Sequence, residues 1–149
     1  MRDLRYGIEI EMTGLSRGKA AETLAGFFGT RAEHTGGSYD AYAVRDAQDR
    51  VWKLVSDGSI QTQKKVRGQT VAADSTYSVE LVSPVCVYED IETIQEIVRA
   101  LRRNNALVMT AAGSMSMLGR KNLMRSICGT SRILWQARRN SSTKPCRWT

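Results

Sequence analysis

Two carboxylates stand two residues apart near the start of the chain, in the run Tyr6-Gly7-Ile8-Glu9-Ile10-Glu11-Met12. Apolar residues alternate with the glutamates, and this period of two predicts a β-strand. Glu9 and Glu11 would share one strand face about 6–7 Å apart, opposite the apolar side chains that face a core. Like charges that close repel unless a positive group lies between them, and hard carboxylate oxygens suit Mg²⁺ or Mn²⁺. The alternative is a half-exposed strand whose two glutamates are solvated.

Two further acidic positions follow along the chain, Asp57 and Glu80. Glu80 would share a strand face with valine, where a carboxylate is poorly hydrated and needs a partner. That partner is either a cation in a site or one of the nearby arginines. Asp57 and Ser59 form a turn directly after a strand-like run that contains adjacent Trp52 and Lys53. Because strand parity lets only one of these two face a site, we expect Trp52 in the core and Lys53 on the functional face.

The elements that must position these residues follow from periodicity and from capping signals. We expect helices at 17–28, capped by Ser16 and stopped by Gly29, and at 89–103, where acidic residues begin the helix and arginines end it. Strands are expected at about 5–13, 30–35, 40–46, 50–56 and 77–82, with an exposed loop at 61–75. This order predicts an α+β fold with a largely antiparallel sheet and helices packed on one face.

Composition places the chain among soluble globular proteins, with 149 residues, 42% hydrophobic and 25% charged. No apolar run approaches the length of a membrane span, and no secretory signal is visible. Three cysteines without metal-type spacing are expected to be reduced thiols. These features predict a cytoplasmic protein without a membrane partner.

Positive charge is confined to the C-terminal part of the chain. Residues 1–105 carry a net charge of −1, whereas residues 106–149 carry +8 and contain no Asp or Glu. Nucleic acid would therefore be contacted only through the basic tail, residues 109–149.

Taken in order, three motifs resemble the amidoligase family. They are the Glu9/Glu11 strand, the run Arg50-Val51-Trp52-Lys53-Leu54-Val55-Ser56-Asp57-Gly58-Ser59-Ile60, and Val79-Glu80-Leu81-Val82-Ser83-Pro84 followed by a helix. The resemblance covers roughly residues 5–108 and predicts a partial amidoligase-like domain over 1–108. Members of this family are similar to glutamine synthetases and γ-glutamylcysteine ligases, which implies an incomplete version of the glutamine synthetase-like ligase fold.

The activity that this resemblance implies is the ATP-dependent joining of a small-molecule or peptide carboxylate to an amine through an acyl phosphate. Glu9, Glu11 and Glu80 would bind Mg²⁺ beside the phosphates of ATP. Asp57, Ser59 and Lys53 would form the catalytic end, where the acceptor or the nucleotide is positioned.

The chain departs from the family after the second helix, where members usually carry a Cys-Gly-x-His-x-His-type strand. Here the chain reads Gly113-Ser114-Met115-Ser116-Met117-Leu118. Codons for this run, read one base earlier, permit Gly-Ile-His-Val-His-Val. Our hypothesis is that residues 109–149 are an out-of-frame, poorly ordered tail, which would make the chain a truncated and inactive copy. The alternative is a natural basic extension of a non-enzymatic nucleic-acid-binding protein.

Overall fold

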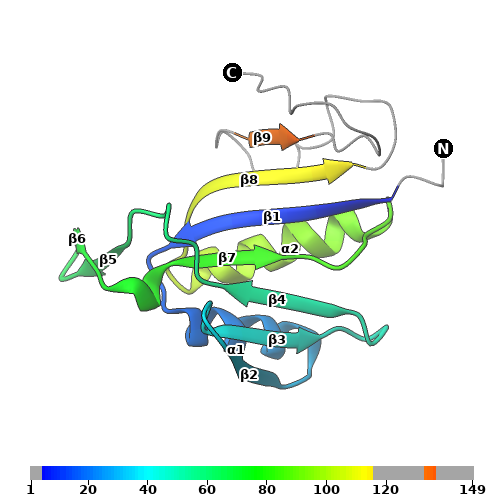
Figure 1. Ribbon diagram of the computed structural model, residues 1–149, viewed down its shortest axis with the longest axis horizontal. Helices are drawn as coiled ribbons and strands as arrows, with labels where there is room; N and C mark the ends of the chain where they lie inside the picture. The colour runs from blue at the N-terminus through cyan, green and yellow to red at the C-terminus, as the bar shows by residue number, and fades with distance from the viewer. Residues whose placement is uncertain (1–4, 116–132, 137–149) are drawn as a thin grey trace.

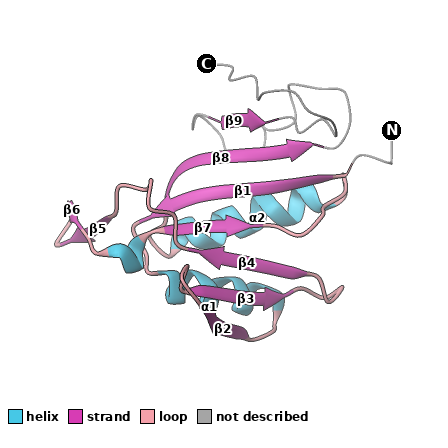
Figure 2. Ribbon diagram, viewed as in Figure 1, coloured by secondary structure: helices cyan, strands magenta, loops and turns pink. Residues whose placement is uncertain are grey.

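A computed structural model of the chain describes residues 5–115 and 133–136. Within these ranges the fold is α+β, with one large, mostly antiparallel sheet and two α-helices, as predicted (Figures 1 and 2). The large sheet consists of β1 (Tyr6–Thr13), β2 (Ala32–Gly36), β3 (Ala41–Arg45), β4 (Val51–Val55), β7 (Val79–Val82), β8 (Leu107–Met115) and β9 (Ile133–Gln136). Their order across the sheet is β2-β3-β4-β7-β1-β8-β9, so the acidic strand β1 lies between β7 and β8.

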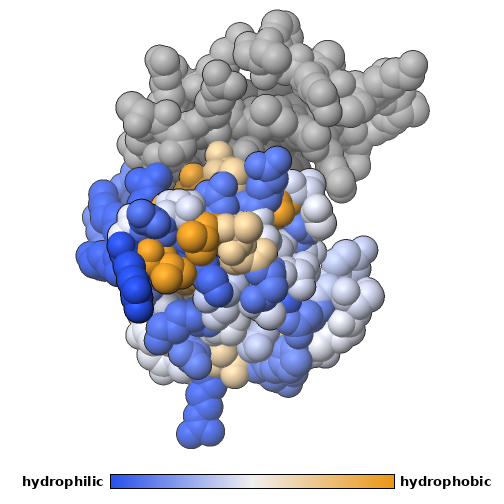
Figure 3. Space-filling model, turned by 90° about the vertical axis from the view of Figure 1, so that its left-hand side faces the viewer, coloured by the Kyte–Doolittle hydropathy of each residue, from blue (hydrophilic) through white to orange (hydrophobic). Residues whose placement is uncertain are grey.

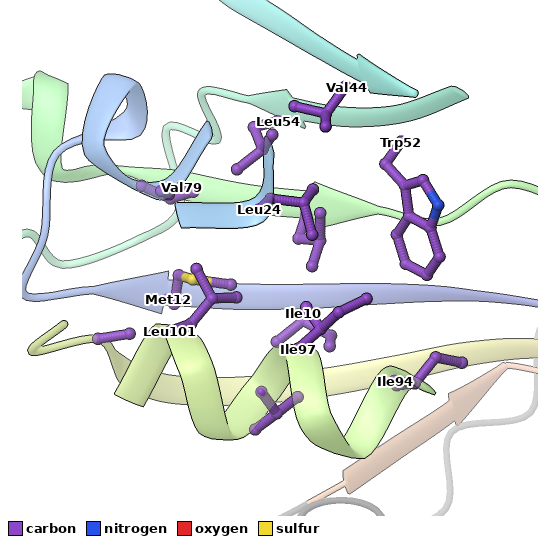
Figure 4. Close-up of a cluster of buried hydrophobic side chains, with 14 of the residues drawn as sticks. Ile10, Met12, Leu24, Val44, Trp52, Leu54, Val79, Ile94, Ile97 and Leu101 are labelled. Atoms are coloured by element: carbon purple, nitrogen blue, oxygen red, sulfur yellow. The ribbon is translucent and has the colours of Figure 1, made fainter. Parts of the chain in front are cut away.

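Strand β1 has the alternating burial that its sequence predicts. Ile8, Ile10 and Met12 are at most 2% exposed, whereas Glu9 is exposed. The apolar side chains join the core, which also takes in buried residues of β4, β7 and both helices (Figure 4). Burial on one face of the strand therefore forces Glu9 and Glu11 onto the other face.

Helices α1 (Arg17–Phe28) and α2 (Asp90–Arg103) cover the apolar face of the sheet. Ser16 caps α1 by accepting a hydrogen bond from the Lys19 amide, and Gly29 ends it with φ of 68°. Helix α2 buries Ile94, Ile97, Val98 and Leu101 on one stripe against the sheet. Neither helix in the described part of the chain is long and apolar enough to cross a membrane.

The segment 61–75 is largely exposed, as predicted, but the prediction that it is a loop is wrong. Strands β5 (Gln63–Val66) and β6 (Gln69–Ala72) form a separate two-stranded sheet there, followed by the short 3₁₀ helix η1 (Ser75–Tyr77). The hairpin turns at Arg67 and Gly68, both with positive φ, which is the geometry of a tight two-residue turn. Arg67 occupies the first turn position, where Asn or Asp is usual, and the polar, basic strand Gln63–Val66 lacks a clear apolar alternation, so the hairpin is not evident from the sequence.

Strand β8 runs from Leu107 to Met115 and so crosses the domain boundary predicted at 108. Strand β9 pairs with it in parallel, Ala111 opposite Ile133. The rest of the predicted tail, residues 116–132 and 137–149, lies outside the described residues, so the prediction of a poorly ordered tail there stays a prediction.

Candidate functional site

The face of the sheet opposite the helices brings together the glutamates of β1 and β7. Antiparallel pairing places Glu11 directly opposite Glu80, and Glu9 opposite Val82. Their neighbours Ile10 and Leu81 are buried in the core, so the glutamates point to the other side. Residues directly opposite on such strands have Cβ atoms about 4.5–5.5 Å apart. The sequence-predicted carboxylates therefore share one surface.

Glu80 occupies an unfavourable position for a carboxylate. Burial raises the pKa of its carboxyl above the ordinary value, and the negative charges of Glu9, Asp57 and Glu11 raise it further. Each of these effects acts against ionisation. Carboxylates from β1, β7 and the turn after β4 thus act electrostatically on Glu80, which is the kind of perturbation that accompanies functional sites.

Lys53 lies on the same surface, one strand beyond Glu80. It pairs with Val82, and Val82 in turn pairs with Glu9, so these three positions form one row across the sheet. Lys53 is exposed, while its neighbour Trp52 is 1% exposed and belongs to the core. The expected orientation of this pair is confirmed, and Lys53 belongs to the same face of the sheet as the carboxylates, two strands from Glu9.

Asp57 and Ser59 form a turn that is tied to the start of β7. The Asp57 amide donates to Ser78 Oγ at 2.9 Å, and Ser78 Oγ donates back to the Asp57 carbonyl at 2.6 Å. The Asp57 carboxylate accepts a hydrogen bond from the Ser59 amide at 2.8 Å. These bonds hold Asp57 at the end of β4 that adjoins Glu80, while the Ser59 side chain stays exposed.

Arg17 supports this turn, although sequence reasoning did not assign it a role. Its guanidinium is buried and donates to the carbonyls of Ser78, at 2.6 Å, and of Ser75, at 3.0 Å, and it forms an ion pair with Asp40. The sequence could have indicated this role. Ala20 and Ala21, which are buried in α1, follow Arg17 by three and four residues, so Arg17 lies on the same helix face as these alanines. A charged residue on the apolar stripe of a helix needs buried partners.

The donors on this surface fit a hard divalent cation. Carboxylate oxygens are the ligands that Mg²⁺ prefers, and a cation would offset the repulsion between Glu11 and Glu80. Among residues 5–115 and 133–136, no three His, Cys, Asp or Glu side chains already converge closely enough to hold a metal ion. To hold a cation together, these side chains would have to turn toward one another.

A shallow cleft lies elsewhere, between α1 and α2 on the helical side of the sheet. It is lined by Lys19, Glu22, Thr23, Gly26, Phe27, Ala100, Arg103 and Asn104. Because the sheet separates it from the carboxylates, the cleft is no part of their site.

Comparison with known proteins identifies the family of the chain. A family model described as "Putative amidoligase enzyme" matches residues 2–117, a stretch that contains Glu9, Glu11, Lys53, Asp57, Ser59 and Glu80. No curated protein and no solved structure gives a significant match. The family model covers most of the chain. It extends past residue 108, at which the resemblance seen in the sequence ends. The chain therefore belongs to the amidoligase family.

Proposed function

We propose that this domain is an ATP- and Mg²⁺-dependent amidoligase that joins a carboxylate to an amine. The carboxylate oxygen of one substrate would attack the γ-phosphorus of ATP, which releases ADP and leaves an acyl phosphate. The amine nitrogen of the second substrate would then attack the acyl carbon, and phosphate would leave as the amide forms. Family membership supports the reaction class.

Glu9, Glu11 and Glu80 would hold the cation through their carboxylate oxygens. When bound, Mg²⁺ neutralises charge on the phosphates and orients them for in-line transfer. Lys53 supplies a positive charge on the same surface and would bind an anionic oxygen of the phosphate or the substrate. Asp57 and Ser59, fixed by the hydrogen bonds to β7, would shape the position of the acceptor.

One observation carries this proposal: Glu11 lies directly opposite Glu80. Like charges in that position destabilise a sheet, and the nearby charges of Glu9 and Asp57 add to the cost. Glu80 is in addition part-buried, and its burial disfavours the ionised form. A cation-binding site accounts for the arrangement.

Calorimetric titration of the full chain with ATP tests the proposal. We expect binding that requires Mg²⁺ and that disappears in the double variant Glu9→Gln plus Glu11→Gln. The matched control is Glu22→Gln plus Glu96→Gln, which removes the same charge from the helical side, where both residues form exposed ion pairs. Undiminished ATP affinity in the site variant, or no binding by the wild-type chain, would refute the proposal.

We propose further that the chain binds the nucleotide without completing the reaction, because its C-terminal part is out of frame. The absence of Asp and Glu after residue 105 supports this. The family match ends at residue 117, so a frame change lies near or before that point only if the first residues of the tail, 109–117, still resemble the family by chance. The coding DNA around codon 109 decides the matter. A stop in the upstream frame, or the absence of an encoded His-x-His, would exclude a frame change.

The basic tail leaves a second candidate function, nucleic-acid binding. Its net charge of +8 without any acidic residue favours a polyanionic partner. This function predicts DNA or RNA affinity that falls steeply with salt, survives the Glu9/Glu11 variant and is lost when the tail's Lys and Arg residues are replaced by Gln. Substitution is preferable to deletion because residues 109–115 belong to strand β8.

A further inference from the structure

The β5–β6 hairpin is built differently from the rest of the fold. It forms its own two-stranded sheet and projects from the end of the large sheet (Figure 1). Its base is anchored to the end of β1: Thr13 Oγ and the Gly14 amide both donate to the Gln63 carbonyl, at 3.0 and 2.9 Å. Beyond this anchor its strands are largely exposed. An isolated hairpin is marginally stable, and this one is held in place at its base while its tip, Arg67 and Gly68, is exposed.

The hairpin carries only positive charge. Between Asp57 and Asp74 the chain has Lys64, Lys65 and Arg67 and no acidic residue. Lys64 lies over the Tyr77 ring, 5.4 Å from its centroid, whereas Lys65 and Arg67 form no ion pair with any residue in the described ranges.

Hydrophobic surface accompanies these charges. Cross-strand pairing puts Lys64, Val66 and Val71 on one face of the hairpin, and the two valines are 45% and 38% exposed. Seen from this end, the molecule shows hydrophobic side chains among hydrophilic ones (Figure 3). Lys65 pairs with Thr70 and so lies on the opposite face, while Arg67 occupies the turn. The hairpin therefore carries cations on both faces and at its tip, with the apolar side chains beside Lys64.

The hairpin also lies close to the proposed catalytic surface. Gln63 contacts Thr13, which is two residues beyond Glu11, and Lys65 is two residues beyond Gln63. With a strand rise of about 3.3 Å per residue, the backbones at Glu11 and Lys65 are on the order of 10–15 Å apart.

From this arrangement we infer that the β5–β6 hairpin binds a carboxylate-rich acceptor, an acidic peptide, whose reacting carboxylate reaches the Glu9/Glu11/Glu80 surface. This inference rests on the proposed ligase function and names its substrate class. Lys65 and Arg67 pair with additional carboxylates of the peptide, and the arginine fork can hold one carboxylate by two hydrogen bonds. The outer edges of the hairpin pair with no other described strand and offer backbone groups to an extended peptide.

Calorimetric titration of the full chain with a tetraglutamate peptide, at low salt and in EDTA without nucleotide, tests this inference. The variant is Lys65→Ala plus Arg67→Asn, which spares the Lys64 contact with Tyr77. Asn at position 67 suits the positive φ of this turn, so the variant is expected to be at least as stable as the wild type. We expect its affinity for tetraglutamate to fall about tenfold or more.

The matched control is Lys19→Ala plus Arg103→Ala, which removes two charges from the cleft on the helical side. It should bind tetraglutamate within about twofold of the wild type, because charges this distant are screened. Equal losses in both variants, no loss in the hairpin variant, or a wild-type chain that binds tripolyphosphate but not tetraglutamate would each overturn the inference. Since metal and ATP are absent, these results stand apart from the Mg²⁺-dependent ATP binding that tests the ligase proposal.

Discussion

Arg50 donates to both carboxylate oxygens of Asp90, at 2.8 and 2.9 Å, and so joins the start of β4 to the start of α2. The same guanidinium pairs with Asp46 at 2.8 Å, and the Asp46 carboxylate also accepts a hydrogen bond from the Trp52 indole. Asp46 and Asp90 are both largely shielded from water. This network fixes one end of the β3–β4 hairpin against the helical layer.

Replacing Arg50 by Ala should therefore destabilise the fold strongly. It leaves two shielded carboxylates without their cation, and breaking such a pair costs about 3–5 kcal/mol. Urea unfolding followed by circular dichroism measures the loss. Arg45→Ala is the matched control, because Arg45 forms an exposed ion pair with Asp49 in the same hairpin. We expect the control to cost less than about 1 kcal/mol, and equal losses in the two variants would contradict this account.

Acid should unfold the protein partly through the same network. The hydrogen bond from Arg50 lowers the pKa of Asp90. For Asp46, burial raises the pKa but is outweighed by hydrogen bonds from Trp52, Arg50 and Gln48, and the net shift is downward. The unfolded chain, with an ordinary aspartate pKa near ~3.9, then binds more protons than the folded one. Stability is full above that value and is lost as the pH falls toward the folded pKa values.

The Asp90→Asn variant checks this linkage. It removes one of the shifted groups, so its free energy of unfolding should fall less steeply between about pH 4 and pH 2 than that of the wild type. Parallel curves for the two proteins would show that Asp90 contributes no pH dependence.

Local patterns were sufficient to predict the strand and its faces at β1. Ile8, Glu9, Ile10 and Glu11 alternate, and the alternation alone specifies which side chains enter the core. The register between β1 and β7 was beyond such reasoning, because it is decided by the packing of strands that lie far apart in sequence. The sequence thus predicts which acidic residues belong to this surface. Only the structure shows that Glu11 and Glu80 lie directly opposite each other.

Neither the β5–β6 hairpin nor the structural role of Arg17 is predicted by local sequence patterns, and the two cases have a common cause. Both put charged residues where simple patterns expect other types: Arg67 in a left-handed turn and Arg17 on a buried helix stripe. Tertiary contacts compensate in each case, through the Gln63 anchor of the hairpin and through the carbonyls around the guanidinium. Compensation by distant residues is invisible to local propensity.

If the carboxylate surface serves a cation, removing one carboxylate should stabilise the metal-free chain. We expect Glu80→Gln to raise the free energy of unfolding in EDTA by about 0.5–1 kcal/mol, because it relieves repulsion from Glu11. The same variant should lose any stabilisation that Mg²⁺ gives to the wild type. Thermal unfolding with and without Mg²⁺ measures both effects.

Glu33→Gln provides the comparison for that experiment. Glu33 is exposed on strand β2, near the edge of the sheet, so its replacement should change stability by less than about 0.5 kcal/mol. A lower melting temperature of Glu80→Gln in EDTA would mean that the Glu80 carboxylate already has a stabilising partner. The repulsion that a bound cation is proposed to offset would then not exist.

Gly14 connects the end of β1 to the base of the β5–β6 hairpin and should tolerate no side chain. Its φ is +89°, and an added Cβ would come within 2.3 Å of the Asn105 carbonyl oxygen. Gly14→Ala should therefore lower the free energy of unfolding by about 3 kcal/mol or more and disturb the hydrogen bond from its amide to Gln63.

Gly26→Ala is the matched control, since nothing lies within 4 Å of its added Cβ and it sits inside α1. That variant should gain about 0.5–1 kcal/mol in urea unfolding, and a stable Gly14→Ala protein would show that the junction is not as tightly packed as described.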